Sequence, residues 1–246
     1  MSRRICIEAC IASVEDAIAA YEGGADRLEL NMALRLDGLT PSLGLLREVK
    51  AAVPLPVIVM IRPRAFGFYY SSSEFTVMQT DIDAFLQEGI AGFAFGILTT
   101  EQEIDVPRTR QIVHQIKGVE SVFHRAFDIT PNPDIALNQL VDLGISRILT
   151  SGHMPTAPQG MENLRNLQQK AASRIEILPG SGVNTSNVAA LLAQTGCTQI
   201  HGTFRPPIES QTLTGLDTLR AHPPQGTSKE IVREIRTIVD ALKQDS

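Results

Sequence analysis

The sequence predicts a TIM barrel, an eight-stranded parallel barrel surrounded by helices, as a single domain over residues 1–246. Short apolar runs alternate with amphipathic stretches along almost the whole chain. This alternation repeats eight times in 246 residues, a usual length for such a barrel. The first apolar run is followed by no glycine-rich nucleotide-binding turn, which disfavours the rival fold, an open doubly wound sheet.

Eight segments are predicted as strands because they are apolar, rich in Val, Ile, Leu and Phe, and bounded by turn residues. Most of them are apolar on both faces, which is typical of parallel strands covered by helices. In chain order, the predicted strands are 4–10, 27–31, 56–63, 91–98, 120–127, 146–152, 174–182 and 198–204.

The amphipathic stretches between these segments are predicted as helices. Gly23 and Gly24 end the first one, and Thr40 is a candidate N-cap before Pro41 at the start of the second. The segment 203–228 is expected to form a long irregular loop, a feature that is usually functional or part of an interface. The predicted helices are 14–22, 42–52, 74–88, 107–117, 133–143, 158–172, 184–194 and a closing helix near 228–243.

Composition excludes several classes of partner. The formal net charge is −5 and no basic patch is present, so nucleic acid and anionic membranes are not expected partners. Apolar runs such as 57–61 are far too short to span a membrane. The three cysteines form no CxxC motif and no disulfide framework, which favours a cytoplasmic location.

Candidate catalytic residues collect at the carboxyl ends of the predicted strands, where TIM barrels hold their active sites. Leu28 and Leu30 suit the helix layer, so the alternating Glu29 and Asn31 should point into the barrel. The alternative is that the carboxylates only join a buried network with nearby arginines. The candidates for acid–base chemistry are Glu8, Glu29, Arg62, His124, Asp128 and His201.

The stretch FHRAFD, residues 123–128, places three ionisable side chains directly after a strand. His124 alternates in phase with Val122 and should face the barrel mouth, whereas Arg125 should face outward. Asp128 either orients His124 or pairs with Arg125, and the sequence leaves both open. A histidine alone is more often a hydrogen-bonded core residue than a catalyst, but the polar strand ends nearby favour a functional site.

A second group of residues suggests an anion site. Gly180, Ser181 and Gly182 follow the seventh strand, a position from which many TIM barrels bind phosphate through backbone N–H groups, and Ser151 follows the sixth. A plain glycine-rich turn is the alternative. All five lysines fall in predicted helices or at helix ends, which disfavours Schiff-base chemistry. These observations predict an isomerase-type or lyase-type enzyme for a small phosphorylated or carboxylated metabolite.

Seven motifs in chain order resemble the copper homeostasis protein family CutC. The resemblance implies a TIM barrel, a cytoplasmic location, a homo-oligomer (dimer or tetramer) and a role in copper tolerance. An oligomeric binding protein without chemistry remains a further alternative. The motifs are EAC (8–10), GADRLEL (24–30), GLTPS (38–42), IRPR (61–64), FHRAFD (123–128), LTSG (149–152) and GSGV (180–183).

The resemblance also implies copper(I) binding by two cysteines, one ending the first strand and one ending the second. Cys10 matches the first position, but Asn31 occupies the second. Copper(I) prefers soft sulfur ligands, and an amide is a poor substitute for a thiolate. We therefore expect copper binding at Cys10 without a tight copper(I) site within one chain.

Overall fold

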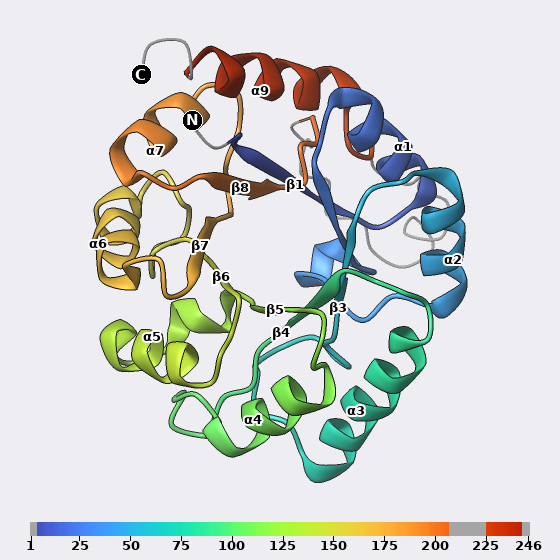
Figure 1. The fold of residues 1–246 in the computed structure, drawn as a ribbon, viewed down its shortest axis with the longest axis vertical. Helices are drawn as coiled ribbons and strands as arrows, with labels where there is room; N and C mark the ends of the chain where they lie inside the picture. Colours follow the sequence, from blue (N-terminus) through green and yellow to red (C-terminus); the bar gives the residue numbers. More distant parts are fainter. Residues whose placement is uncertain (1–3, 207–224, 243–246) are drawn as a thin grey trace, which may run out of the picture.

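The computed structural model describes residues 4–206 and 225–242, and it confirms the predicted fold class. Parallel strands run in the order β7-β6-β5-β4-β3-β2-β1-β8, and β7 lies beside β8, so the sheet curves into a nearly closed barrel (Figure 1). The strands are β1 Cys6–Ile11, β2 Arg27–Leu30, β3 Val57–Met60, β4 Gly92–Phe95, β5 Glu120–Phe123, β6 Arg147–Thr150, β7 Glu176–Pro179 and β8 Gln199–Gly202.

Helices surround the barrel, and each predicted helix has a counterpart among them (Figure 1). The α-helices are α1 Val14–Gly23, α2 Leu43–Ala52, α3 Ser72–Leu86, α4 Val106–Gln115, α5 Pro133–Asp142, α6 Met161–Ala171, α7 Val188–Thr195 and α9 Lys229–Ala241. Two short 3-10 helices, η1 Leu34–Leu36 and η2 Arg125–Ile129, follow β2 and β5.

Strand alternation divides the buried apolar side chains into two clusters. In β3, Val57 and Val59 belong to the layer between the strands and the helices, whereas Ile58 and Met60 belong to a small cluster inside the barrel. The inner cluster also contains Ala94, Val122, Leu149 and Leu178, one each from β4 to β7. On the side formed by β3 to β7, this apolar plug lies between two polar layers, one at each end of the barrel, whereas Glu8 of β1 connects the two layers.

Local sequence signals explain where helices begin and end. Ser71 and Glu74 form a capping box at the start of α3, and Gly24 ends α1 with φ of 96°. The N-cap of α2 is Ser42, whose hydroxyl accepts from Leu45 N–H, and not Thr40 as predicted. The Thr40 hydroxyl accepts the backbone N–H of Arg62 instead, because the chain after β2 turns back towards β3.

Two boundaries near the cavity also differ from the sequence prediction. The fifth strand ends at Phe123, because His124 caps η2 rather than continuing the strand. The helix predicted from residue 184 begins only at Val188, after a turn over residues 184–187. Most of the predicted loop 203–228 lies outside the described residues. The closing helix is α9, which packs between α7 and α1 (Figure 1).

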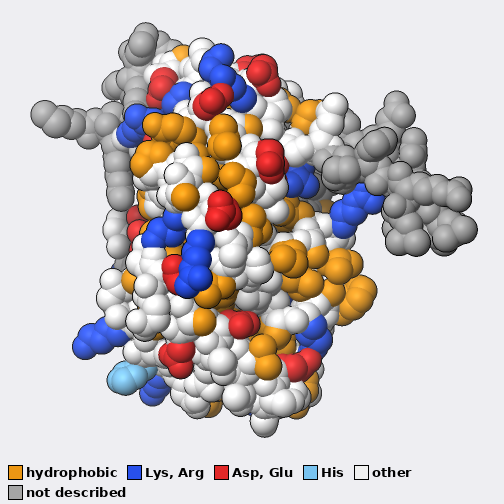
Figure 2. Space-filling view, turned by 90° about the vertical axis from the view of Figure 1, so that its right-hand side faces the viewer, with side chains coloured by type: hydrophobic (Ala, Val, Ile, Leu, Met, Phe, Trp, Pro, Cys, Tyr) orange, Lys and Arg blue, Asp and Glu red, His pale blue; other side chains and the backbone are white. Residues whose placement is uncertain are grey.

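The outer surface shows no strong separation of charge on the face that carries α1, α2 and α3. There, acidic and basic side chains are interspersed with hydrophobic ones (Figure 2).

Within the described part of the chain, no helix combines the length and the apolar character needed to cross a membrane.

Candidate functional site

A cavity of about 790 Å³ opens at the carboxyl ends of the strands, where the sequence places the candidate residues. Eight of the predicted residues line it: Cys10, Glu29, Arg62, His124, Asp128, Ser181, Gly182 and His201. Three others do not reach its wall: Glu8, Ser151 and Gly180. The strand ends therefore bring together side chains that lie up to 191 positions apart in the chain, from Cys10 to His201.

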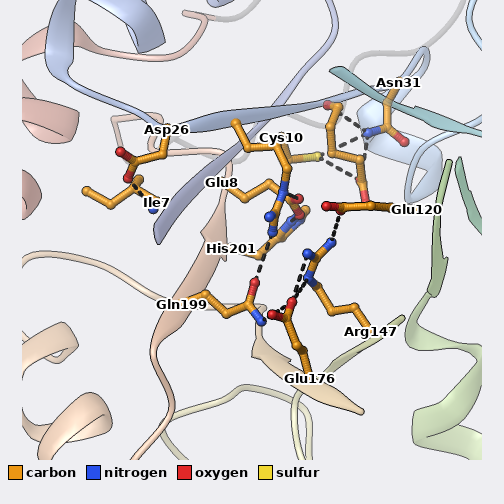
Figure 3. A network of polar contacts seen from close by, with 12 residues as sticks. Ile7, Glu8, Cys10, Asp26, Asn31, Glu120, Arg147, Glu176, Gln199 and His201 are labelled. Atoms are coloured by element: carbon orange, nitrogen blue, oxygen red, sulfur yellow. Dashed lines mark hydrogen bonds and ion pairs between the residues drawn. The ribbon is translucent and has the colours of Figure 1, made fainter. Parts of the chain in front are cut away.

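Below the apolar plug, the floor of the barrel is a connected polar network (Figure 3). Arg27 bonds to Glu8, and its Nη2 donates to Gln199 Oε1 at 3.0 Å. Arg147 Nη1 lies 2.9 Å from a carboxylate oxygen of Glu120. Both buried arginines in this layer therefore have carboxylate partners, and Arg147 also pairs with Glu176 at 2.8 Å.

Glu8 links the floor to the mouth. Its Oε1 accepts from His201 Nδ1 at 2.8 Å, while its Oε2 bonds to Arg27. Burial alone would raise the pKa of Glu8, but Arg27 and the hydrogen bond from His201 hold that pKa well below its usual value. Burial would lower the pKa of His201, yet the nearby Glu29, Cys10 and Glu8 raise it well above its usual value. Glu8 and His201 therefore form an ion pair.

Cys10, Glu29 and His201 form a compact, buried cluster at the mouth, and Figure 3 labels two of them, Cys10 and His201. Their ligand atoms all lie within 4.8 Å of one another. Asn31 Nδ2 donates to Cys10 Sγ at 3.3 Å and to Glu29 Oε1 at 2.9 Å. Burial raises the pKa of the Cys10 thiol and of the Glu29 carboxyl, so both hold their protons more strongly than in water. A thiol, an imidazole and a carboxyl thus share one small volume.

Several buried polar atoms at the mouth have no hydrogen-bond partner among the described residues. They are Glu29 Oε2, Asn31 Oδ1, Arg62 Nε and His124 Nε2. Buried polar groups are almost always paired in folded proteins, so each unpaired atom calls for an explanation. All four side chains line the same cavity, but Asn31 Oδ1 lies against Gly38, so ligand contacts are expected for Glu29, Arg62 and His124.

Arg62 follows β3 and is 4% exposed. Its Nη1 donates to the carbonyl oxygens at the end of η1, those of Leu36, Asp37 and Gly38, at 2.9 to 3.0 Å. Its guanidinium also lies over the ring of Phe68, at 5.1 Å from the centroid. These contacts fix the orientation of Arg62 without neutralising its charge.

His124 is buried and neutral. Burial, followed by the positive charge of Arg62, lowers the pKa of His124 to about 3. Its Nδ1 accepts from Ala126 N–H at 3.2 Å, which leaves the proton on Nε2. The ring fits because residue 96 is glycine: a Cβ there would lie 2.6 Å from His124 Nδ1. His124 therefore carries an N–H donor at Nε2 and is not a base.

Asp128 pairs with Arg125 and does not orient His124. Arg125 Nε lies 2.8 Å from Asp128 Oδ2, and Asp128 also accepts from the backbone N–H groups of Ser151 and His153. The hydroxyls of Thr150 and Ser151 also donate to Asp128. Asp128 thus holds the loop after β6 against η2, which settles the alternative that the sequence left open.

The predicted anion-binding residues divide into two groups. Ser181 and Gly182 line the cavity, and Ser181 adopts a left-handed backbone with φ of 77°. Gly180 N–H donates to Thr150 in the neighbouring strand, and a Cβ at this glycine would lie 2.6 Å from Leu149. The Ser151 hydroxyl bonds to Asp128 and to a loop carbonyl. Gly180 and Ser151 therefore stabilise the strand ends and loops around the cavity through their hydrogen bonds.

Phe68 is a residue of the cavity wall that sequence reasoning did not identify. It lies in the loop after β3 and packs against both Arg62 and His124, with 4.9 Å between its ring centroid and that of His124. An aromatic residue in a loop carries no periodic signal. Its place in the loop directly after the IRPR motif is the only feature that would have drawn attention to it.

Comparison with known proteins relates this chain to one protein family. The CutC family profile matches residues 5–206. A CutC family protein of Treponema denticola is 40% identical over 238 residues, which cover 88% of this chain and 97% of the relative. One from Chromobacterium violaceum is 35% identical, covering 95% of this chain and 98% of the relative.

Solved structures give the same result. A Streptococcus agalactiae protein, described as a candidate copper homeostasis protein CutC, superposes with a TM-score of 0.77 at 32% identity, over 80% of this chain and 98% of its own. A phosphoribosylanthranilate isomerase from Pyrococcus furiosus has a TM-score of 0.56 at 15% identity, over 97% of this chain and 100% of its own, which shows a shared barrel fold alone. The chain therefore belongs to the CutC family.

Proposed function

We propose that this protein binds a transition-metal ion through Cys10, Glu29 and His201, in keeping with the copper homeostasis role named for its family. The observation that carries this proposal is the 4.8 Å cluster of three chemically different ligand atoms. Glu8 supports it, because a carboxylate bonded to the remote nitrogen of a ligand histidine is a common feature of metal sites. The bond on His201 Nδ1 leaves Nε2 as the ligand atom.

The donor set favours a divalent ion over copper(I). One thiolate, one imidazole and one carboxylate suit borderline ions such as zinc or copper(II), whereas copper(I) prefers several sulfur ligands. Asn31 turns its amide nitrogen towards Cys10 and Glu29, and an amide nitrogen is a donor that does not bind metals. Metal binding must release the protons of these groups, so affinity should rise with pH.

Competition titrations with copper(I), copper(II) and zinc test this proposal, with anaerobic conditions for copper(I). We expect one equivalent of a divalent ion to bind, and this binding to disappear in Cys10→Ser. Cys197→Ser is the matched control, because Cys197 is equally buried but lies outside the cavity. Asn31→Cys should strengthen copper(I) binding. Tight copper(I) binding in the unaltered protein, or divalent binding that survives Cys10→Ser, would contradict the assignment.

A second candidate function is acid–base catalysis, of isomerase or lyase type, on a small phosphorylated or carboxylated metabolite. The specific observation is the size of the cavity, since about 790 Å³ fits a small organic molecule and far exceeds a metal ion. Glu29 offers a carboxyl group to such a molecule, and His124 offers an N–H donor. Incubation with a pool of metabolites, followed by mass spectrometry, tests it. Turnover should disappear in His124→Phe while the fold is kept, and no turnover of any metabolite would contradict it.

We further propose that the protein is a cytoplasmic homo-oligomer, a dimer or tetramer. All three cysteines are free thiols in the structure, which suits a reducing compartment. The loop after β3 exposes large apolar side chains, with Phe66 at 81% and Tyr69 at 53%, and such exposure is typical of an interface. Light scattering tests the assembly, and a particle of 26.8 kDa would contradict it.

A further inference from the structure

Arg62 and His124 form a pair of unused donors on one wall of the cavity. Both side chains are almost completely buried, at 4% and 3% exposure, and both line the cavity. Among the described residues, neither Arg62 Nε nor His124 Nε2 has a hydrogen-bond partner, although the Arg62 side chain also interacts with the hydroxyl of Tyr70. Leaving a buried donor unpaired costs about 1–3 kcal/mol, and more when the group is charged, so two such atoms on side chains that pack against the same ring, that of Phe68, indicate an acceptor from outside the chain.

Arg62 also lacks a counter-ion. Among the described residues, no carboxylate forms an ion pair with it, whereas the other two buried arginines, Arg27 and Arg147, each have one or more. Three carbonyl oxygens hold its Nη1, and these are dipoles without net charge. A buried cation without an anion is costly, because desolvation amounts to several kcal/mol per ion. An anionic ligand would offset that cost.

Phe68 connects the two donors and limits the shape of the acceptor. Its ring lies 5.1 Å from the Arg62 guanidinium carbon and 4.9 Å from the His124 ring centroid. Because His124 is neutral, the pair carries one positive charge in total. The wall thus offers one positive charge, N–H groups from the Arg62 guanidinium and from His124 Nε2, and a flat aromatic surface.

We propose that Arg62 and His124 bind the carboxylate of a small organic acid, whose remainder extends across the cavity towards Cys10, Glu29 and His201. A planar monoanion matches the planar guanidinium and the single charge, and arginine binds carboxylates through two parallel hydrogen bonds. A phosphate dianion carries twice the charge around a tetrahedral centre, which matches neither the single positive charge nor the planar guanidinium of this wall. The inference rests on the second function proposed above, for which it names the class of substrate.

Binding of simple carboxylates, measured without turnover, tests this inference. Acetate, glycolate and pyruvate are titrated up to 50 mM with EDTA present, so that no metal contributes. We expect the Arg62 Nε–H resonance to shift in nitrogen-15 NMR spectra and the melting temperature to rise. A ligand at ten times its dissociation constant stabilises the fold by about 1.4 kcal/mol. Inorganic phosphate at equal ionic strength should produce a smaller effect.

Three variants separate this site from general anion binding. Arg62→Met and His124→Phe should each weaken carboxylate binding at least tenfold. Arg125→Met is the matched control, because Arg125 lines the same cavity but is already paired with Asp128, and it should retain binding. The NMR shift of the unaltered protein serves as the readout if a variant does not fold.

Other outcomes would overturn the inference. They are tighter binding of phosphate than of any carboxylate, no response to any carboxylate at 50 mM, or carboxylate binding that survives both Arg62→Met and His124→Phe. Carboxylate binding without turnover of any metabolite would count against the enzymatic proposal alone. The two failures can therefore be told apart.

Discussion

Arg27 and Arg147 at the floor of the barrel bond to carboxylates, whereas the side chain of Arg62 at the mouth bonds to carbonyl oxygens. Strand alternation brings polar groups inside at both ends, and the apolar plug lies between them. Every polar atom of the Gln199 side chain at the floor has a partner, while Glu29 Oε2 and Asn31 Oδ1 at the mouth have none within the described part of the chain. The difference supports the proposal that the floor contributes to stability and the mouth binds a ligand.

The largest effect is expected from breaking the floor network. Arg27→Met should lower the free energy of unfolding by about 3–5 kcal/mol, because Glu8 would remain buried without its arginine. Urea unfolding monitored by circular dichroism measures this loss. A loss below about 1 kcal/mol would show that the floor network contributes no more than a surface ion pair.

A pH-dependent effect is expected at the mouth. Folding lowers the pKa of His124 from 6.5 to about 3, so between these values the unfolded chain binds a proton that the folded chain does not. Above pH 6.5, His124 therefore does not reduce the free energy of unfolding. As the pH falls below 6.5, it reduces that free energy progressively. Between pH 6.5 and 4.5, the loss should be about 2–3 kcal/mol, since each pH unit corresponds to about 1.4 kcal/mol.

His124→Gln should remove this component, because glutamine does not titrate. Urea unfolding of both proteins at pH 6.5 and 4.5 provides the comparison. Groups common to both proteins cancel in the difference. Equal pH dependence of the two proteins would show that His124 titrates normally and is not desolvated.

A smaller effect is expected when the mouth arginine is removed. Arg62→Met should cost about 1–2 kcal/mol, because carbonyl hydrogen bonds are lost but no carboxylate is left unpaired. The comparison with Arg27→Met under identical conditions is decisive. If Arg62→Met is the more destabilising change, then Arg62 is a structural residue and the contrast between floor and mouth fails.

The smallest effect is expected for an ion pair on the outer surface. Lys170 and Asp134 lie 2.6 Å apart on neighbouring helices, and both side chains are more than half exposed. Lys170→Ala should change the free energy of unfolding by less than about 1 kcal/mol, because water and salt screen such pairs. A loss as large as that in Arg27→Met would mean that burial does not explain the role of the floor network.

Much of the candidate site follows from local patterns in the sequence. Glu29 and His124 could be placed at the mouth because strand alternation and the carboxyl ends of parallel strands are local features. The roles of Ser151 and Gly180 could not be predicted in this way. Their bonds to Asp128 and Thr150 cross from one strand or loop to another, and no local pattern specifies them.

The sequence by itself determined the barrel, the order of its elements and the set of side chains that point inward, because hydrophobic periodicity acts over a few neighbouring residues. Only the tertiary structure decided the pairings: Glu8 with Arg27 and His201, and Asp128 with Arg125. It also decided that Arg62 is buried without a carboxylate partner among the described residues. Such pairings depend on which strands become neighbours and on side-chain geometry, and these are fixed only when the sheet curves into a barrel.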